Sequence, residues 1–500
     1  MGDNLFNRFA QSAADPDKIF LLPPGRPAVR YRESFAAAAR LAHVLTRHGV
    51  QPGDRVAVQV EKSPGALFLY LACLRAGAVY LPLNSGYTPS ELTYFVGDAE
   101  PRLFVVAEKN KAANAAALPD TPLLTLSDDG LSGSLITEAV GQPDDFTDAD
   151  VGMGDLASIL YTSGTTGRSK GAMLSHGNLF SNAQSLKEVW RFSKSDVLLH
   201  ALPLFHIHGL FVATNVTLLS GASMLLLPRF DLDAVFDALP LASTMMGVPT
   251  FYTRMLQDAR LNQDGTKHMR LFVSGSAPLL AETHRQWQAR TGHAILERYG
   301  MTETGMNTSN PYDGARIPGS VGLPLPGVEV RIADKTGQPL APGEIGMIEV
   351  RGPNVFQGYW RMPEKTASEF RPDGFFITGD LGTLDAEGYL GIVGRDKDLI
   401  ISGGLNIYPK EIESLIDELP GVEEAAVVGL PHPDFGEGVT AFIVKTRDSV
   451  LTEDTVLGAL ANLARFKHPK RVLFVDQLPR NTMGKVQKSA MRESFKTLYG

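Results

Sequence analysis

The chain of 500 residues has one cysteine, no long apolar run and no overall basic excess. Cys73 lies in an apolar stretch and is expected to be a small buried residue. A single cysteine cannot form an internal disulfide, which fits a protein in a reducing compartment. No uninterrupted apolar run approaches the roughly 18 residues of a membrane span, and residues 1–20 lack the apolar core of a signal peptide. These absences predict a soluble, cytoplasmic protein with no membrane partner.

Positive charge is scarce except near the end of the chain. The sequence has 47 Lys and Arg against 55 Asp and Glu, a net charge of −8, which argues against nucleic acid as a partner. Residues 463–500 differ, with nine Lys or Arg against two acidic residues and a local net charge of +7. This segment is expected to meet an anionic small molecule, the alternative being a solvated basic helix.

Hydrophobic periodicity predicts alternating helices and strands over roughly the first 320 residues. Residues 35–50 have helical spacing and residues 55–60 form a short strand, and similar alternation recurs downstream. Such alternation is typical of largely parallel sheets covered by helices. Beyond residue 320, short strands separated by turn signals predict a small barrel-like or antiparallel module, and residues 410–446 follow a helix–strand–strand order. We therefore expect an α/β fold with a small α+β domain at the end.

Residues 161–171, YTSGTTGRSKG, contain three Gly, five Ser or Thr, an Arg and a Lys. Glycines let consecutive backbone N–H groups converge on phosphate oxygens, while hydroxyls and Lys170 add donors and charge. A Walker A loop needs G-x-x-x-x-G-K-[ST], but here Arg168 follows Gly167 and Gly171 follows Lys170. The loop therefore predicts phosphate binding outside the P-loop class, with a plain flexible loop as the alternative.

Five further motifs follow this loop in order: SGSAPL (274–279), ERYGMTET (297–304), FFITGD (375–380), GRDKD (394–398) and PRNTMGKVQK (479–488). The ordered set resembles the adenylate-forming enzymes, which comprise acyl- and aryl-CoA synthetases, adenylation domains and luciferases. The resemblance covers residues 10–495. It implies an AMP-forming acid–thiol ligase: ATP and an acid form an acyl-adenylate with release of pyrophosphate, and coenzyme A then displaces AMP.

The resemblance also implies the domain organisation. It divides the chain into an N-terminal domain at 1–394 that binds ATP and the acid, a hinge at 395–398, and a mobile C-terminal domain at 399–500. Lys397 matches the position about which the C-terminal domain swings.

Most motif residues are implied to bind ATP. The loop would grip the β- and γ-phosphates, Tyr299 would pack on adenine, Thr302 would contact the α-phosphate, and Asp380 would take the ribose hydroxyls. Glu303 is implied as the ligand of Mg²⁺, a hard cation that carboxylates bind. The residues implied to bind ATP or AMP are Thr162, Ser163, Gly164, Thr165, Thr166, Gly167, Lys170, Gly275, Ser276, Ala277, Pro278, Glu297, Tyr299, Gly300, Met301, Thr302, Asp380 and Arg395.

Lys485 matches the catalytic lysine of the first half-reaction. Its charge would bridge the substrate carboxylate and the α-phosphate, where negative charge gathers in the transition state. Acylation by a protein acetyltransferase, a further expected partner, would remove that charge. The residues implied to be catalytic are Lys485, Glu303, Thr302 and His206.

Coenzyme A is the implied acceptor. Gly403 and Gly404 lie where the family lets the pantetheine arm pass, and Arg465 and Lys467 are expected to meet its phosphates. One departure concerns a lysine that many relatives carry shortly after the hinge. The segment LIISGGLNIYP at 399–409 lacks it.

Arg298 is the residue that bears on the choice of acid. A buried guanidinium is costly to desolvate unless an anion pairs with it, and it grips a carboxylate bidentately. The alternatives are an Arg298 turned to solvent or paired with a neighbouring acidic residue, with Arg229 as a second candidate. The ERYGMTETGMN and LPLFHIHGLF stretches resemble those of malonyl-CoA synthetases. This implies malonate as substrate, with methylmalonate as a second; the residues implied to bind the acid are His206, Arg298, Met306 and Ser276.

Two other functions stay open at this point. One is a ligase of the same family for a short monocarboxylate such as acetate or propionate. The other is a non-catalytic nucleotide-binding relative, which would need none of the chemistry of Lys485, Glu303 and Asp380. Oligomeric state is not predicted.

Overall fold

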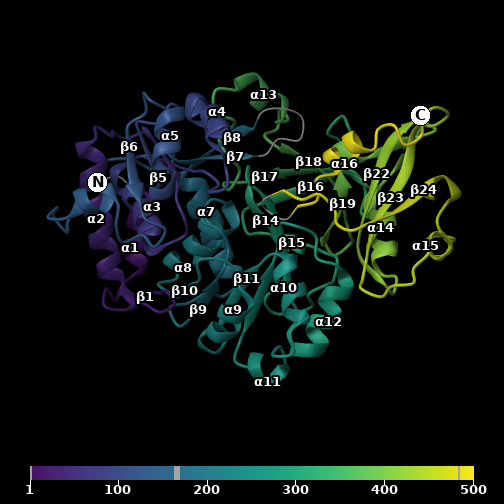
Figure 1. The fold of residues 1–500 in the computed structure, drawn as a ribbon, viewed down its shortest axis with the longest axis horizontal. Coiled ribbons are helices and arrows are strands. Elements are labelled where there is room, and N and C mark those ends of the chain that lie inside the picture. Colours follow the sequence, from purple (N-terminus) through teal and green to yellow (C-terminus); the bar gives the residue numbers. More distant parts are fainter. Residues whose placement is uncertain (1–2, 163–168, 482–484) are drawn as a thin grey trace.

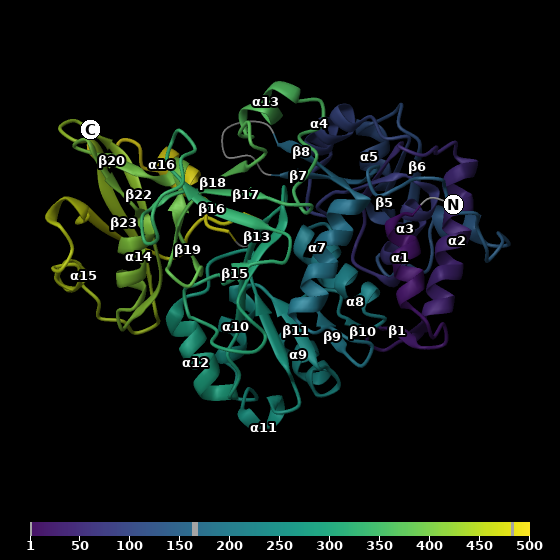
Figure 2. The same ribbon diagram turned by 180° about the vertical axis from the view of Figure 1, so that it is seen from behind.

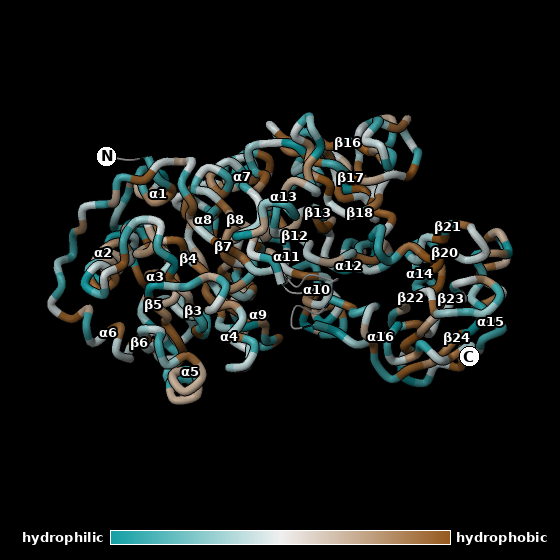
Figure 3. Tube along the Cα trace, turned by 90° about the horizontal axis from the view of Figure 1, so that it is seen from above, coloured by the Kyte–Doolittle hydropathy of each residue, from teal (hydrophilic) through white to brown (hydrophobic). Residues whose placement is uncertain are grey.

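The computed structural model describes residues 3–162, 169–481 and 485–500. It consists of two helix-covered sheets, a smaller antiparallel sheet and a separate C-terminal domain, which lies at the opposite end of the molecule from helices α1–α6 (Figures 1 and 3). Within the described residues, we find no helix of the length and apolarity needed to cross a membrane. The α/β class expected from the sequence is confirmed.

The first sheet has six strands in the order β6-β5-β3-β4-β7-β8. Neighbours pair in parallel except β7 and β8, which form an antiparallel pair. The strands are β3 (Arg55–Gln59), β4 (Val79–Pro82), β5 (Leu103–Ala107), β6 (Leu123–Leu126), β7 (Leu156–Thr162) and β8 (Lys170–Ser175). The helices of this lobe are α1 (Leu5–Ser12), α2 (Tyr31–Arg47), α3 (Pro64–Ala76), α4 (Pro89–Ala99), α5 (Lys111–Ala117) and α6 (Ser134–Ala139).

Helix α3 shows how the local sequence sets an element. The Ser63 hydroxyl caps its first turn by accepting from the Ala66 N–H at 3.3 Å, and Pro64 occupies the first helical position. Gly77 ends it in the left-handed region at φ +69°. Nearly every residue between is buried, as expected of a helix that is apolar on all sides. Cys73 lies within it, and burial raises the pKa of its thiol.

The second sheet has nine strands in the order β15-β14-β13-β12-β11-β9-β10-β1-β2. It is parallel from β13 to β1 and antiparallel at both edges. The strands are β1 (Ile19–Leu22), β2 (Val29–Arg30), β9 (Val197–His200), β10 (Ser223–Leu226), β11 (Thr244–Gly247), β12 (Leu271–Ser274), β13 (Leu296–Met301), β14 (Gly305–Ser309) and β15 (Leu323–Pro324). The associated helices are α7 (His176–Val189), the π-helix η2 (His208–Thr214), α8 (Asn215–Leu219), α9 (Leu232–Ala238), α10 (Pro249–Leu256), α11 (Gln263–Thr266) and α12 (Ala281–Thr291).

Residues beyond 325 form the antiparallel module and the C-terminal domain. The module is a four-stranded sheet of β16 (Glu329–Ala333), β17 (Gly346–Arg351), β18 (Phe376–Leu384) and β19 (Leu390–Arg395), with α13 (Pro363–Ser368) beside it. A 3₁₀ turn, η4 (Asp396–Asp398), then leads into the C-terminal domain. That domain contains β20 (Ile400–Ser402), β21 (Leu405–Ile407), α14 (Pro409–Asp417), β22 (Val422–His432), β23 (Gly436–Lys445), α15 (Glu453–Ala459), β24 (Arg471–Val475) and α16 (Lys488–Ser494).

The C-terminal domain has its own hydrophobic core. Buried side chains of its helices and strands, among them Ile400, Ile412 and Val439, form a cluster distinct from the cores of the two large sheets. Figure 2 shows this domain (yellow) beside the antiparallel module and away from the N-terminal lobe. A separate core is the physical condition for one domain to move relative to another.

Candidate active site

Strand β13 is the centre of the site. It carries ERYGM and pairs with β14 in a hairpin, with Arg298 opposite Ser309 and Tyr299 opposite Thr308. Successive side chains of a strand point to opposite faces, so Tyr299 and Arg298 project from different faces of β13. The two faces meet different partners and have different chemistry.

The Tyr299 face is a network of satisfied polar groups. The Tyr299 hydroxyl donates to Asp380 Oδ2 at 2.6 Å, and Arg395 Nε lies 3.1 Å from Asp380 Oδ1. Asp380 and Arg395 are register partners on β18 and β19, so the hairpin itself brings them together. Burial, and then the Asp380 charge, raise the pKa of Tyr299. A carboxylate beside an aromatic ring and a guanidinium can take ribose hydroxyls next to a stacked base.

Glu297 lies two residues before Tyr299 on the same face. Its side chain is buried and accepts from the Gly319 N–H at 3.3 Å. Burial raises the pKa of this carboxyl to about 8, opposed by the Gly319 hydrogen bond and the charge of Lys410 from α14. Glu297 is therefore protonated near neutral pH. The charge of Lys410, a residue of the C-terminal domain, lowers its pKa somewhat.

Lys170 and Glu303 belong to a second charged cluster, at the other end of the site. Lys170 Nζ lies 3.2 Å from Glu369 Oε1 and 4.1 Å from the centre of the Tyr359 ring. The Tyr359 hydroxyl is within donating distance of both Glu369 (2.6 Å) and Glu303 (3.0 Å). Burial raises the pKa of Glu303. The cluster combines a cation with carboxylates, which suits a polyphosphate bound together with a divalent cation.

The glycine-rich loop begins and ends at one point. Thr162 and Lys170 are register partners at the paired ends of β7 and β8, so the loop starts and finishes beside Tyr359. The predicted phosphate-binding residues Ser163, Gly164, Thr165, Thr166 and Gly167 lie outside the described residues.

Lys485 reaches this site from the C-terminal domain. It is half-buried, and its backbone N–H donates to Asn481 Oδ1 at 3.0 Å. Burial is the main cause that lowers its pKa to about 8, followed by the Arg395 charge, with Asp380 acting in the opposite direction. Arg298 and Glu303 also act on its titration. The pKa of Lys485 thus responds to charged residues on both faces of β13 and in the Glu303 cluster.

The Arg298 face, in contrast to the Tyr299 face, carries buried polar atoms without hydrogen-bond partners among the described residues. Arg298 is 4% exposed, so it does not turn to solvent. Within residues 3–162, 169–481 and 485–500, its Nε and Nη2 have no hydrogen-bond partner and the guanidinium has no salt bridge. Burial lowers its pKa to about 9. The guanidinium packs directly on Gly275, where a Cβ would lie 2.3 Å from Arg298 Cζ; only glycine leaves this space.

Met306, Ser276 and His206 are the other residues predicted to bind the acid. Met306 is buried, and its Cε packs against Gly300, where a Cβ would be 2.6 Å away. Ser276 adopts φ +71°, a left-handed backbone unusual for serine. Burial, then the charges of Lys485 and Arg298, lower the pKa of His206 to about 3, so its imidazole is neutral.

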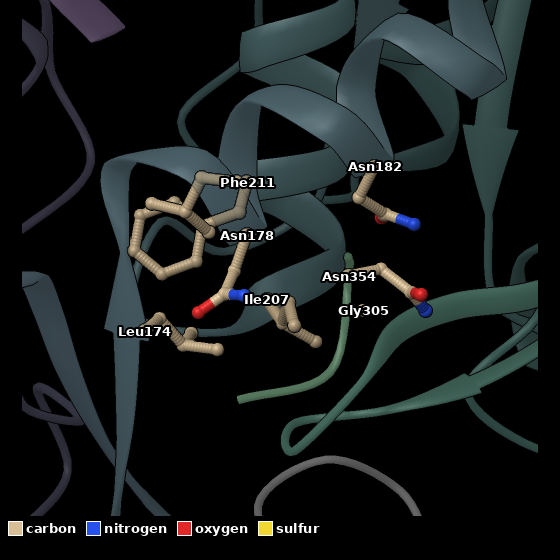
Figure 4. Close-up of a pocket in the computed structure, with 8 residues that line it drawn as sticks. Leu174, Asn178, Asn182, Ile207, Phe211, Gly305 and Asn354 are labelled. Atoms are coloured by element: carbon tan, nitrogen blue, oxygen red, sulfur yellow. The ribbon is translucent and has the colours of Figure 1, made fainter. Parts of the chain in front are cut away.

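The hairpin that carries these residues is braced from behind. Asn182 of α7 accepts from the Met306 N–H at 3.0 Å and donates to the Met306 carbonyl at 2.8 Å. Asn354 donates to the Thr304 carbonyl at 2.7 Å. Figure 4 shows both amides beside Gly305, around a cavity of about 10 Å³ that also involves Ile207 and Phe211. That volume suits one water and no substrate, so this cavity is not the binding pocket of the site.

The predicted coenzyme A residues lie elsewhere, in the C-terminal domain. Gly403 and Gly404 form the β20–β21 turn with φ of +58° and +81°, a conformation that glycine adopts freely. The Lys467 ammonium is paired with Glu411 at 2.7 Å, and Arg465 is exposed. Lys397 is exposed in η4.

Several site residues escaped the sequence reasoning. Tyr359 and Glu369 complete the Glu303 cluster, Asn182 braces the hairpin, and His208 contacts Ser276. His208 could have been noticed from the second histidine in FHIHG. The others give no local signal because their partners are far away in the sequence.

The chain is similar to several known proteins. Family models for the AMP-binding enzyme and for the AMP-binding enzyme C-terminal domain match residues 9–360 and 411–485. The ATP-bound crystal structure of MatB from Rhodopseudomonas palustris is 58% identical and covers 100% of both chains with a TM-score of 0.98. A malonate–CoA ligase of Arabidopsis thaliana is 35% identical over 97% of this chain and 88% of its own. A feruloyl-CoA synthase of Amycolatopsis is 38% identical over 94% and 95%.

The family models and these similar proteins define an adenylate-forming enzyme. The chain belongs to the AMP-binding enzyme family and is an AMP-forming acid–thiol ligase.

Proposed function

We propose that this enzyme ligates malonate to coenzyme A through malonyl-adenylate, using ATP and releasing pyrophosphate and AMP. Methylmalonate is the second proposed substrate, because one added methyl group changes apolar transfer by only about 1 kcal/mol. The observation that carries the assignment of the acid is Arg298, a buried guanidinium without an acidic partner among the described residues. The relatives named for malonate and the likeness to MatB support it.

The argument from Arg298 is electrostatic. A buried charge is tolerated when it is paired and hydrogen-bonded, yet no residue in the described ranges 3–162, 169–481 and 485–500 accepts a hydrogen bond from Nε or Nη2 of Arg298. A carboxylate would accept from both in a bidentate contact. An acid with two carboxylates can satisfy Arg298 with one and present the other for adenylation.

The residues of this chain divide the chemistry of the first half-reaction. Lys485 would stabilise negative charge as the carboxylate oxygen attacks the α-phosphorus and pyrophosphate leaves. Thr302 would donate its hydroxyl to the α-phosphate. His206, neutral because of its lowered pKa, would orient the reacting carboxylate without adding a competing cation.

ATP and Mg²⁺ are the proposed partners of the remaining motif residues, including those of the loop at 163–167. Glu303 fits a divalent cation because its carboxylate is buried, borders on the Tyr359 hydroxyl and shares its cluster with Lys170. When bound, Mg²⁺ would neutralise phosphate charge and so help pyrophosphate to leave.

The second half-reaction is proposed to follow a swing of residues 399–500 about the hinge at 395–398, with Lys397 at its centre. Gly403 and Gly404 would then line the passage of the pantetheine arm, and Arg465 and Lys467 would meet the phosphates of coenzyme A. The cytoplasm is the proposed compartment, in keeping with the single buried Cys73. Acylation of Lys485 by a protein acetyltransferase would silence adenylation.

A short monocarboxylate is the competing substrate. Acetate or propionate would leave Arg298 unpaired, and an unpaired buried charge weakens binding. A purely nucleotide-binding role would leave the convergence of Lys485, Glu303 and Asp380 without use.

The test is pyrophosphate release dependent on ATP and Mg²⁺, with malonate, methylmalonate, succinate or acetate, each with and without coenzyme A. We expect the highest kcat/KM with malonate and formation of a thioester only when coenzyme A is present. Preference for acetate would overturn the assignment of the acid, and binding of ATP without turnover of any acid would overturn catalysis.

A further inference from the structure

The inference concerns His208, the second histidine of the FHIHG motif. His208 is the first residue of the π-helix η2 and is 1% exposed. Its Nδ1 lies 3.2 Å from the Ser276 hydroxyl. Its Nε2 is buried and has no hydrogen-bond partner in the described parts of the chain, 3–162, 169–481 and 485–500. A buried polar atom without a protein partner is uncommon and calls for an explanation.

His208 and Arg298 share one environment. The Arg298 charge is the main electrostatic influence that, after burial, lowers the pKa of His208. The same guanidinium packs on Gly275, next to the serine that contacts His208. Three nitrogens that have no hydrogen-bond partner among the described residues, Nε and Nη2 of Arg298 and Nε2 of His208, therefore belong to side chains gathered around the Gly275–Ser276 turn.

We propose that His208 is a second reader of the substrate's distal carboxylate, donating its Nε2–H to that carboxylate beside the Arg298 guanidinium. The inference rests on the proposed function, because only a diacid brings a second carboxylate to this place. It makes His208 a residue that determines specificity, distinct in role from His206.

Ser276 sets the tautomer that this role requires. A neutral imidazole carries one N–H, so Nε2 can donate only if Nδ1 accepts from the Ser276 hydroxyl. Ser276 holds that hydroxyl in place from a left-handed backbone with φ +71°. Glycine would adopt this conformation more readily, so the backbone alone does not favour a serine at this position.

The position of His208 is also fixed from behind. Lys62 Nζ lies 2.7 Å from His200 Nδ1, and His200 Nε2 lies 2.8 Å from the Gly209 carbonyl. A Cβ on Gly209 would be 2.0 Å from the Pro203 carbonyl oxygen, so the turn packs too tightly for any other residue. These contacts fix the backbone next to His208, and the Ser276 contact orients its ring, so less order has to be gained when substrate binds.

The two histidines then serve opposite ends of a short diacid. After burial, the charge that most affects His206 is Lys485, whereas the charge that most affects His208 is Arg298. His206 would face the carboxylate that reacts, and His208 the carboxylate that is recognised. The FHIHG motif thus brings one imidazole to each end of the acid.

Three substitutions of His208 separate donation from packing. The amide of His208→Gln can place a donor near the position of Nε2, that of His208→Asn can reach only toward Ser276, and His208→Phe keeps the ring without either nitrogen. We expect His208→Asn and His208→Phe to raise the KM for malonate by about 10- to 100-fold with little change in kcat. His208→Gln should stay within about 5-fold of the parent.

The measurements are KM and kcat for malonate and for propionate by pyrophosphate release, with the Kd for ATP as a control. The inference is overturned if His208→Phe leaves the KM for malonate unchanged. It is also overturned if His208→Gln and His208→Asn lose activity equally on both acids, which would indicate packing. If His208→Phe fails to fold, Ser276→Ala replaces it, with an expected three- to tenfold rise in KM for malonate and none for propionate.

The proposed function fails in a different way from this inference. If the parent enzyme does not activate malonate, both fall together. If it does so and Arg298→Met abolishes the preference for malonate while His208→Phe keeps it, only the role of His208 is lost.

Discussion

The two faces of β13 differ in how far their buried polar groups are hydrogen-bonded within the protein. On one face Tyr299, Asp380 and Arg395 satisfy each other before any ligand arrives. On the other face Arg298 and His208 are buried with nitrogens that no described residue accepts from. Under the proposed function, the first face is a preorganised site for ATP, which binds in every turnover. The second face would be completed only when the acid supplies acceptors for these nitrogens, so selectivity for the acid would cost the free enzyme stability.

Lys485 is the residue whose loss should affect both faces, and it has the largest expected effect. Lys485→Gln removes the cation that meets both clusters, so we expect malonate-dependent pyrophosphate release to fall by about 100- to 1000-fold. Conversion of supplied malonyl-adenylate and coenzyme A to the thioester should continue, because that step does not need the lysine charge. Retained pyrophosphate release in Lys485→Gln would contradict the role.

Arg298→Met should weaken use of the acid without changing the binding of ATP. Removing one partner of a buried charge pair costs about 2–5 kcal/mol of binding, so kcat/KM for malonate should fall by about 30-fold or more while the Kd for ATP is unchanged. Without substrate, the same change removes a buried charge that has no acidic partner among the described residues, and it should raise the free energy of unfolding by about 1–4 kcal/mol.

Asp380→Asn is the matched control for Arg298→Met. It weakens the Arg395 and Tyr299 contacts and should lower both stability and ATP affinity, with malonate selectivity kept. If Arg298→Met proved less stable than the parent in urea unfolding, the contrast between the two faces would be wrong.

Glu297 should have the smallest effect on activity, because its expected effect is on the pH dependence of stability. Burial raises the pKa of its carboxyl to about 8 in the folded state, above the ordinary value near 4.3. The folded protein therefore holds a proton that the unfolded chain releases. The resulting stabilisation is full below about pH 4 and is lost as the pH rises to about 8, by at most about 5 kcal/mol.

Glu297→Gln should flatten this part of the pH dependence of the free energy of unfolding, measured by urea denaturation between pH 5 and 8.5. An unchanged slope would show that Glu297 is already ionised in the folded protein.

The sequence predicts elements whose causes are local. Ser63, Pro64 and Gly77 set both ends of α3 within its own segment. The pairing of Asp380 with Arg395 follows once β18 and β19 are recognised as a hairpin. The sequence singled out Arg298 but left open whether it is buried, turned to solvent or paired. Its burial, and the absence of an acidic partner among the described residues, required the fold.

Contacts made across the fold could not be predicted. The Tyr359–Glu303 hydrogen bond joins residues 56 positions apart, and Lys62 meets His200 across 138 positions. Each depends on how the two large sheets and the antiparallel module pack, which periodicity does not encode. For the same reason the motif indicated His206 directly, while the role proposed for His208 emerged only from its contact with Ser276.

The alternation of β13 also sets how this enzyme can change. Arg298 can be replaced without touching the side chains that meet Asp380, because the pleat of the strand keeps the two sets apart. A single insertion or deletion within β13 would exchange the two sets at once, turning the guanidinium toward Asp380 and Arg395 and the tyrosine away from them. If the proposed roles hold, new acid specificities are accessible by substitution at this strand, whereas a change in its length would remove nucleotide and acid recognition together.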